Sequence, residues 1–427
     1  MGVVFKGVTA WLPPPDQVGT VDIRVDGRTI ESISSPSAKV DPSDTVLQGD
    51  GKLALPGLIN SHTHAAMTLL RGIADDVPLH TWLHDHVWPI EQRLTEEDVY
   101  WGTMLGLMEM IRSGTTQIAD MYFHVDAVGR AIADIGMRAT ISYGVVANAM
   151  DDRGRSELDA AERAVDVWHN AADGRIRCAV SPHAVYTCGK EVWKAAIRLA
   201  ERYTLPIHTH LAETKREVDD WAQVHGVSPA GTLAQLGALD VPLIAAHCVH
   251  VSEEDVELLA THHATAVHCP CSNAKLASGL APVPELLRAQ VNVALGTDGA
   301  ASNNNLDICR EMRVALLLQK ATTRDATVLD AESALEWATR NGARALDQAT
   351  GRLAPGARAD IVLMEMDETN VLPPHDPVSA VVYASHPGNV TDVMIDGRFV
   401  LRDRQLLTVD EREAQTQAKA RSGRLRT

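Results

Sequence analysis

Eight short apolar runs recur between residues 54 and 299, and segments of helical character separate them. The runs cover 54–60, 115–121, 138–146, 175–183, 205–213, 242–250, 264–272 and 291–299. Parallel strands need long crossover connections, which are usually helices. Eight strands that alternate with helices therefore predict an α/β fold, a (β/α)₈ barrel of the TIM type.

The segments between the runs carry helix signals of their own. The first opens with Thr95-Glu96-Glu97-Asp98, which has the form of a capping box, and it stops at Ser113-Gly114. We expect further helices at 156–171, 189–202, 252–260 and 306–320.

The two ends of the chain differ from the middle. Residues 1–54 and 358–403 contain short alternating runs with turn residues between them, which is typical of antiparallel strands. We expect one small β-sandwich domain built from both termini. The predicted division is 1–54 for the first part of the sandwich, 55–356 for the metal-dependent barrel, and 357–427 for the second part and a C-terminal tail. The last twenty residues resemble a solvated tail.

Composition excludes several classes of protein. The formal net charge of −17 repels phosphate backbones, so we expect a small-molecule partner and no nucleic acid. No basic and apolar leader opens the chain, and no run of about 18 apolar residues predicts a membrane span. Six cysteines in 427 residues are too sparse for a disulfide scaffold. We therefore expect a soluble cytoplasmic protein, and a homo-oligomer. The one-residue spacing of Cys269 and Cys271 indicates that they are buried thiols rather than metal ligands.

Metal-binding residue types gather where the predicted strands end. On a barrel, catalytic groups lie at the C-terminal ends of the strands. The ends of the first, fourth, fifth, sixth and eighth runs carry His62 and His64, His183, His210, His247 and Asp298, respectively. Residues i and i+2 of an extended segment face the same way, so His62 and His64 can reach one ion.

Three imidazoles and one carboxylate suit Zn²⁺ or Fe²⁺, with an open position for water. Any one strand-end histidine is more often structural, but His62, His64, His210 and Asp298 together predict a metal site. His208 shares a strand face with His210 and remains an alternative ligand.

Several other polar and aromatic residues can be interpreted either as site residues or as structural ones. Glu213, three residues after His210, is either a first-turn acid favoured by a helix dipole or a group that transfers protons at the site. Trp82 and Trp88 either line a pocket or belong to the core. His84 and His86 lie in a Trp-rich segment far from a strand end, which favours helix or loop over ligation.

Six stretches resemble a known family: "PGLINSHTHAAMTLLRG", "WPIEQRL", "SPHAVYT", "HTHLAET", "AAHCVH" and "LGTDGAASNNNLD". They are similar to the 5′-methylthioadenosine/S-adenosylhomocysteine deaminases of the amidohydrolase superfamily, and the resemblance extends to about residue 403. It implies a metal-dependent aminohydrolase that removes the adenine 6-amino group of S-adenosylhomocysteine, 5′-methylthioadenosine or adenosine. Guanine and pterin deaminases and triazine hydrolases share much of the pattern and form the alternative. A non-catalytic scaffold is disfavoured because every expected ligand is present.

The resemblance also assigns catalytic roles. His62, His64, His210 and Asp298 match the ligands of one divalent ion, Zn²⁺ or Fe²⁺. Glu213 matches the acid/base that moves a proton from the activated water to the purine N1. His247 matches the residue that orients the attacking hydroxide, and Asp298 relays a further proton to the departing ammonia. No lysine stands at the end of the fourth strand, which implies a single metal.

Substrate contacts follow from the same resemblance. Glu91 and His183 match positions near the ribose, and Arg155 matches an arginine that can meet the carboxylate of a homocysteine tail. Arg155 can equally be a solvated loop charge. Some members carry a second arginine where this chain has Tyr143, which implies a weaker grip on that tail. Trp82 is a candidate for the purine pocket.

Overall fold

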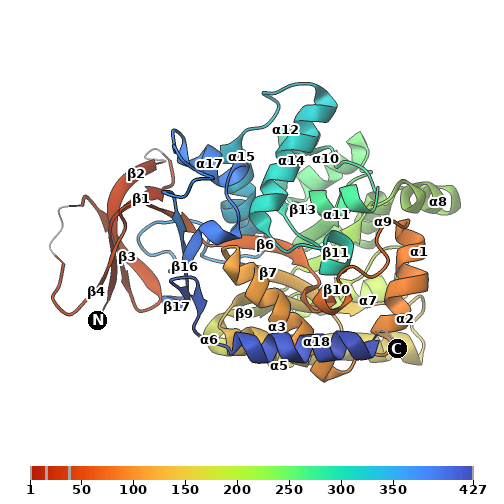
Figure 1. Ribbon diagram of the computed structural model, residues 1–427. Helices are drawn as coiled ribbons and strands as arrows, with labels where there is room; N and C mark the ends of the chain where they lie inside the picture. Colours follow the sequence, from red (N-terminus) through yellow and green to blue (C-terminus); the bar gives the residue numbers. More distant parts are fainter. Residues whose placement is uncertain (1, 15–17, 37–39, 426–427) are drawn as a thin grey trace.

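The parallel strands form two hydrogen-bonded groups. The computed structural model describes residues 2–14, 18–36 and 40–425 (Figure 1). One group contains β6 (Leu58–Thr63), β7 (Thr115–Tyr122), β8 (Arg138–Val145), β9 (Ile176–Cys178) and β10 (Ser181–Pro182). The other contains β11 (Ile207–Leu211), β12 (Leu243–His247), β13 (Thr265–His268) and β14 (Asn292–Leu295). Each of the eight predicted runs contains a strand, and the fourth contains two.

Hydrogen bonds join these groups at both edges. A parallel bridge pairs Val180 with Ile207 between the first and second groups. At the other edge, the backbone N–H of Asp298, just after β14, donates to the carbonyl of His62 in β6 at 3.0 Å. Because the pairings within both groups are parallel, the carboxyl ends of neighbouring strands lie at the same edge.

The predicted helices are present as α3 (Glu96–Arg112), α5 (Asp152–Trp168), α7 (Lys190–Tyr203), α10 (Glu253–Thr261) and α14 (Ile308–Thr323). Thr95 and Asp98 form the expected capping box. The α5 helix begins earlier than predicted because the Asp151 side chain caps it. Sequence reasoning missed α4 (Val125–Ile135), α8 (Lys215–His225) and α9 (Pro229–Leu236).

Shorter helical segments fill the connections. They are η1 (Ala65–Leu70), α1 (Leu79–Thr81), η2 (Trp82–Val87), α2 (Trp88–Glu91), α6 (Ala171–Gly174), η3 (Ala238–Asp240), α11 (Pro270–Lys275), α12 (Val283–Arg288), α13 (Ala300–Asn303), α15 (Ala331–Glu336), η4 (Trp337–Asn341), α16 (Gly342–Ala345), α17 (Pro377–Tyr383) and η5 (Pro387–Asn389). Within the described ranges, no helix is long and apolar enough to cross a membrane.

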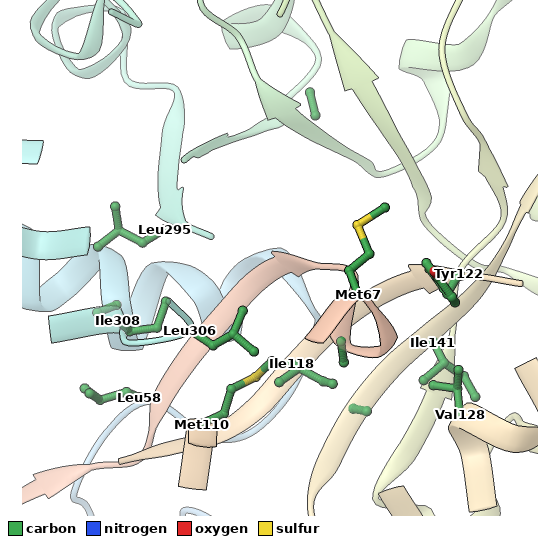
Figure 2. Close-up of a cluster of buried hydrophobic side chains, with 14 of the residues drawn as sticks. Leu58, Met67, Met110, Ile118, Tyr122, Val128, Ile141, Leu295, Leu306 and Ile308 are labelled. Atoms are coloured by element: carbon green, nitrogen blue, oxygen red, sulfur yellow. The ribbon is translucent and has the colours of Figure 1, made fainter. Parts of the chain in front are cut away.

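The main apolar core lies between the parallel strands and the surrounding helices. Leu58, Ile118 and Leu295 come from β6, β7 and β14, while Met110 and Ile308 come from α3 and α14; all five are buried (Figure 2). Each fully buried side chain of this size contributes roughly 1.5–3 kcal/mol relative to an exposed one. This packing fixes the strand ends on which the polar residues stand.

Both termini contribute to a single nine-stranded sheet, seen at the left of Figure 1. Its strands are β1 (Val3–Trp11), β2 (Val18–Asp26), β3 (Thr29–Ser34), β4 (Thr45–Gln48), β5 (Lys52–Pro56), β15 (Ile361–Glu365), β16 (Val390–Ile395), β17 (Arg398–Arg402) and β18 (Gln405–Leu406). The two ends of the chain therefore come together, as expected, and they do so in one sheet. The hydrogen bonding joins these described strands in one sheet, so the division into a two-sheet sandwich stays a prediction.

A buried ion cluster ties this sheet to the parallel strands. Arg138, the first residue of β8, donates to Asp360 at 2.8 and 3.1 Å and to Asp396 at 3.1 Å. All three side chains are almost fully buried. The carboxylates offset the cost of burying the guanidinium, and removal of one partner would leave an uncompensated charge.

The prediction of a solvated C-terminal tail is wrong for residues 411–425. These residues form α18 (Glu411–Leu425), which lies along α3 (Figure 1). Ala414 and Ala418, four residues apart on one helix face, are buried, and Arg421 approaches the buried Asp98 at 3.4 Å. The two small alanines and the ion pair with Asp98 therefore allow this polar helix to pack against α3. Residues 426 and 427 of the predicted tail lie outside the described residues.

Candidate active site

Four of the predicted residues meet at the carboxyl ends of the parallel strands. His62 lies in β6, His64 follows that strand, His210 lies in β11, and Asp298 follows β14. The Nε2 atom of His64 lies 3.3 Å from Nε2 of His210 and 3.3 Å from Oδ1 of Asp298. Nε2 of His62 lies 3.6 Å from the same carboxylate oxygen.

Hydrogen bonds at the far side of each ring turn the Nε2 atoms inward. Nδ1 of His64 lies 2.6 Å from the Met121 carbonyl, and Nδ1 of His210 lies 2.9 Å from the His183 carbonyl. A carbonyl only accepts, so each Nδ1 carries the proton and each Nε2 presents a lone pair. His208 does not join the cluster; its Nε2 lies 2.8 Å from Nδ1 of His62.

The donor set fits a divalent cation. Nε2 of His62 is buried without a hydrogen-bond partner among the described residues. Buried polar atoms are nearly always paired, so a free lone pair on this nitrogen fits the position of a metal ligand. Burial lowers the pKa of His62 to about 4 and that of His210 well below its ordinary value. Both rings are therefore neutral at pH 7, which is the form that binds a metal.

Two serines orient the Asp298 carboxylate. The hydroxyls of Ser272 and Ser302 donate to its Oδ2 at 2.6 and 2.7 Å, which leaves Oδ1 toward the histidines. Sequence reasoning missed both serines. Only their position in the chain could have marked them as site residues. Each serine lies in a short helix that follows one of the last two parallel strands.

Glu213 and His247 lie beside the cluster and face one another. Oε2 of Glu213 is 3.9 Å from Nε2 of His247, and Asn273 accepts a hydrogen bond from Nδ1 of His247 at 2.9 Å. Burial raises the pKa of Glu213, with the nearby His247 opposing the rise. Burial acts to lower the pKa of His247, but the Glu213 and Asp298 carboxylates outweigh it and raise that pKa.

The backbone at two of these residues is unusual. His247 has φ of 74° and Asp298 has φ of 59°, values that non-glycine residues rarely adopt. Such strained residues occur preferentially at functional sites, because the surrounding structure must hold them. Here the strain directs both side chains toward the imidazole cluster.

A pocket opens onto the cluster, and His64, His210, Glu213, His247 and Asp298 line its inner end. Its walls include Trp82, Glu91 and His183, the residues expected to bind substrate, and also Trp88. Other lining residues are Leu79, Leu83, Met121, Tyr122, Phe123, Gly144, Val146, Tyr186 and Leu276.

Glu91 is held at the pocket wall by Tyr122, whose hydroxyl donates to Oε1 at 2.7 Å. Burial raises the pKa of Glu91 to about 7. The ring of His183 also lies within hydrogen-bond distance of the Thr187 hydroxyl, at 3.1 Å, and burial lowers its pKa to about 3. Away from the cluster, the pocket walls thus offer the carboxyl group of Glu91 and the neutral imidazole of His183 to a ligand.

The structure does not bring Arg155 into the pocket. Its guanidinium donates to the Met150 carbonyl at 2.7 Å and to Asp152 at 2.6 Å, and the side chain is exposed. His84 and His86 lie in η2, outside the cluster, as expected of a helical or loop segment.

Comparison with known proteins identifies the class of this site. A sequence model of the amidohydrolase family matches residues 53–400. The chain is 44% identical over 416 residues to a 5-methylthioadenosine/S-adenosylhomocysteine deaminase of Thermoanaerobacter pseudethanolicus, covering 96% of each chain. The protein therefore belongs to the amidohydrolase family.

Two further relatives are also named as deaminases. A 5′-deoxyadenosine deaminase of Methanothermobacter thermautotrophicus is 44% identical over 403 residues, 94% of each chain. The crystal structure of an adenosine deaminase of Xanthomonas campestris with bound zinc superimposes with a TM-score of 0.94. It shares 35% identity, with 99% of this chain and 98% of that chain covered. All three relatives bear the names of deaminases acting on adenine nucleosides.

Proposed function

We propose that this protein is a metal-dependent deaminase of adenine nucleosides. It converts S-adenosylhomocysteine, 5′-methylthioadenosine or adenosine, together with water, into the inosine-type product and ammonia. The names of the relatives at 44% identity support this reaction. The convergence of His62, His64, His210 and Asp298 supports one divalent ion, for which Zn²⁺ suits the donor set. A bound divalent cation supplies the Lewis acidity that makes hydroxide available near neutral pH.

The observation that carries the proposal is the pairing of Glu213 with His247 beside the metal-binding cluster. Deamination adds hydroxide to C6, places a proton on ring N1, and expels ammonia. Glu213, with its raised pKa, can take a proton from water and hand it to N1. His247 directs Nε2 toward the same space because Asn273 holds Nδ1, so it can orient the attacking oxygen. Asp298 can take the proton of the new C6 hydroxyl group and pass it to the leaving nitrogen, which leaves the C6 carbonyl of the product.

The pocket walls support a nucleoside as the substrate. Glu91 and His183 can receive the ribose hydroxyls, and Trp82 offers an aromatic face to the purine. No lysine or arginine is among the described residues that line the pocket. Neutral 5′ substituents therefore suit it directly, whereas a homocysteine carboxylate requires Arg155 to turn inward. Arg155→Ala should weaken turnover of S-adenosylhomocysteine far more than that of adenosine; equal effects on both would refute the carboxylate role.

One assay tests the reaction. Purified protein loaded with zinc is incubated separately with adenosine, methylthioadenosine, S-adenosylhomocysteine and guanine, while ammonia and the shift from adenine to hypoxanthine absorbance are followed. We expect turnover of the adenine nucleosides and none of guanine. Glu213→Gln should lower kcat by about 10²- to 10⁴-fold, and Glu257→Gln, an exposed acid on α10, should leave it unchanged. Guanine turnover alone, or an active Glu213→Gln, would overturn the proposal.

We further infer the finer architecture in which this site stands. The bridge from Val180 to Ile207 and the bond from Asp298 to His62 support closure of the parallel strands into an eight-stranded barrel over 55–356. The terminal segments, 1–54 and 357–427, are proposed as the two parts of a small β-sandwich, with α18 at the end of the second part packed on α3. A cytoplasmic location and a homo-oligomer complete the proposal, and size-exclusion chromatography with light scattering tests the latter.

A further inference from the structure

Glu217 closes a hydrogen-bonded turn directly behind Glu213. Its two carboxylate oxygens accept the backbone N–H groups of Ala212 at 3.2 Å and Glu213 at 2.9 Å. Its own backbone N–H donates to the hydroxyl of Thr214, the N-cap of α8, at 3.1 Å. A capping-box acid ordinarily bonds the N–H of the cap residue itself. Here the acid also reaches the two residues before the cap, and one of them is Glu213.

This turn is one that an unsupported chain disfavours. Ala212 has φ of 51°, a left-handed conformation that non-glycine residues rarely adopt. The Ala212 carbonyl accepts hydrogen bonds from Val249 at 3.1 Å and His250 at 2.9 Å, both in the loop after β12. The turn is therefore fixed from two sides. Its N–H groups are bonded to α8, and its carbonyl is bonded to the loop that follows His247.

We propose that Glu217 is a positioning residue for the reaction, because its carboxylate holds the 212–213 turn in the form that directs Glu213 toward His247 and the metal-binding cluster. The inference rests on the proposed role of Glu213 in proton transfer. Glu213 is only 7% exposed, so the position of its carboxyl group depends on the backbone that carries it. A displacement of about 1 Å at such a group can cost about 10²-fold in rate.

The position requires a carboxylate rather than an amide. Two backbone N–H donors converge on it, and an ionised carboxyl group offers two acceptor oxygens. A glutamine offers one acceptor, and its NH₂ group would then face the second donor. One of the two bonds that define the turn would be lost.

The charge of Glu217 also acts on the site. The titratable groups facing it are Glu213 on the same turn, His247 and Cys248 at the end of β12, and Tyr186 after β10. Burial and the neighbouring Glu213 raise the pKa of Glu217 to about 7. The backbone N–H groups that the Glu217 carboxylate accepts oppose this rise, because they stabilise the ionised form.

The test compares Glu217→Gln with Asp220→Asn in the full chain loaded with zinc. Asp220 is an exposed acid on the same helix, paired with Arg216, so the control makes the same charge change without touching the turn. We expect Glu217→Gln to lower kcat for adenosine about 10- to 100-fold, to change KM little, and to retain zinc. Asp220→Asn should match the wild type. Glu217→Asp keeps the carboxylate but loses reach, so kcat should fall.

Two results separate this inference from its alternatives. A purely structural role would lower the melting temperature of Glu217→Gln while leaving kcat per folded molecule at the wild-type value, and that outcome would overturn the inference. If Glu217→Gln fails to fold, wild-type kcat in Glu217→Asp would overturn it equally. Glu213→Gln is measured in parallel. If that variant is fully active, the proposed function fails, whereas an inactive Glu213→Gln beside a wild-type-like Glu217→Gln rejects only the role of Glu217.

Discussion

Replacement of Glu91 by glutamine should stabilise the protein at alkaline pH while weakening the binding of substrate. Burial raises the pKa of this carboxyl group from an ordinary 4.5 to about 7. The unfolded chain therefore releases the proton first, and stability falls as pH rises from about 4.5 to about 7. Above that window the penalty is complete. At about 1.36 kcal/mol for each pH unit between the two pKa values, it reaches about 3 kcal/mol at pH 8.

Glutamine escapes this penalty and keeps the main contact. It carries no charge, and its carbonyl can still accept the Tyr122 hydroxyl that lies 2.7 Å from Oε1 of Glu91. Because one side of Glu91 faces the pocket, where solvent screens its charge, 3 kcal/mol is an upper value. This free-energy difference is divided by an unfolding entropy of about 2.1 cal/mol/K per residue. The result is a rise in melting temperature of about 3 °C at pH 8. At pH 5 the expected rise is below about 1 °C.

Thermal unfolding at the two pH values provides the measurement. Wild type and Glu91→Gln are first stripped of metal with a chelator, because a bound cation would attract the Glu91 charge. Tyr122→Phe serves as the control, since it removes the donor but leaves the carboxylate, and should destabilise the protein most at pH 8. An unchanged or lowered melting temperature for Glu91→Gln at pH 8, or an equal rise at both pH values, would refute the electrostatic reasoning.

Three further predictions concern the site and its support. Asn273→Leu removes the acceptor that fixes the His247 ring, so kcat should fall at least about tenfold with zinc content unchanged; steady-state kinetics with metal analysis checks this, and wild-type kcat would contradict it. A strong chelator should abolish activity and added Zn²⁺ should restore it, whereas activity that persists in verified metal-free protein would exclude the metal centre. Arg138→Met removes the guanidinium that pairs with the buried Asp360, whereas Asp396 keeps Arg28 and Arg358, and it should cost about 3–5 kcal/mol of stability while kcat at 25 °C stays near wild type; an unchanged melting temperature would contradict this.

Local patterns in the sequence were sufficient to place most of the elements. Each apolar run between 54 and 299 contains a strand because a strand covered on both faces must be nearly continuous in apolar residues. The α3 helix begins where Thr95 and Asp98 predict it, since capping is a contact between near neighbours in the chain. The strand-end histidines were found for a similar reason. Side-chain alternation sets the face of His62 and His64 before any tertiary contact forms.

Only the tertiary structure decided which distant groups meet. The serines that hold Asp298, the contact of His208 with His62, and the reach of Glu217 to the Glu213 turn leave no periodic trace in the chain. The packing of α18 on α3 joins segments about 300 residues apart, and a polar helix shows its buried face only when a partner is present. Local sequence specifies backbone conformation through short-range sterics and hydrogen bonds. The partners of a side chain depend on the path of the whole chain, which no window of the sequence contains.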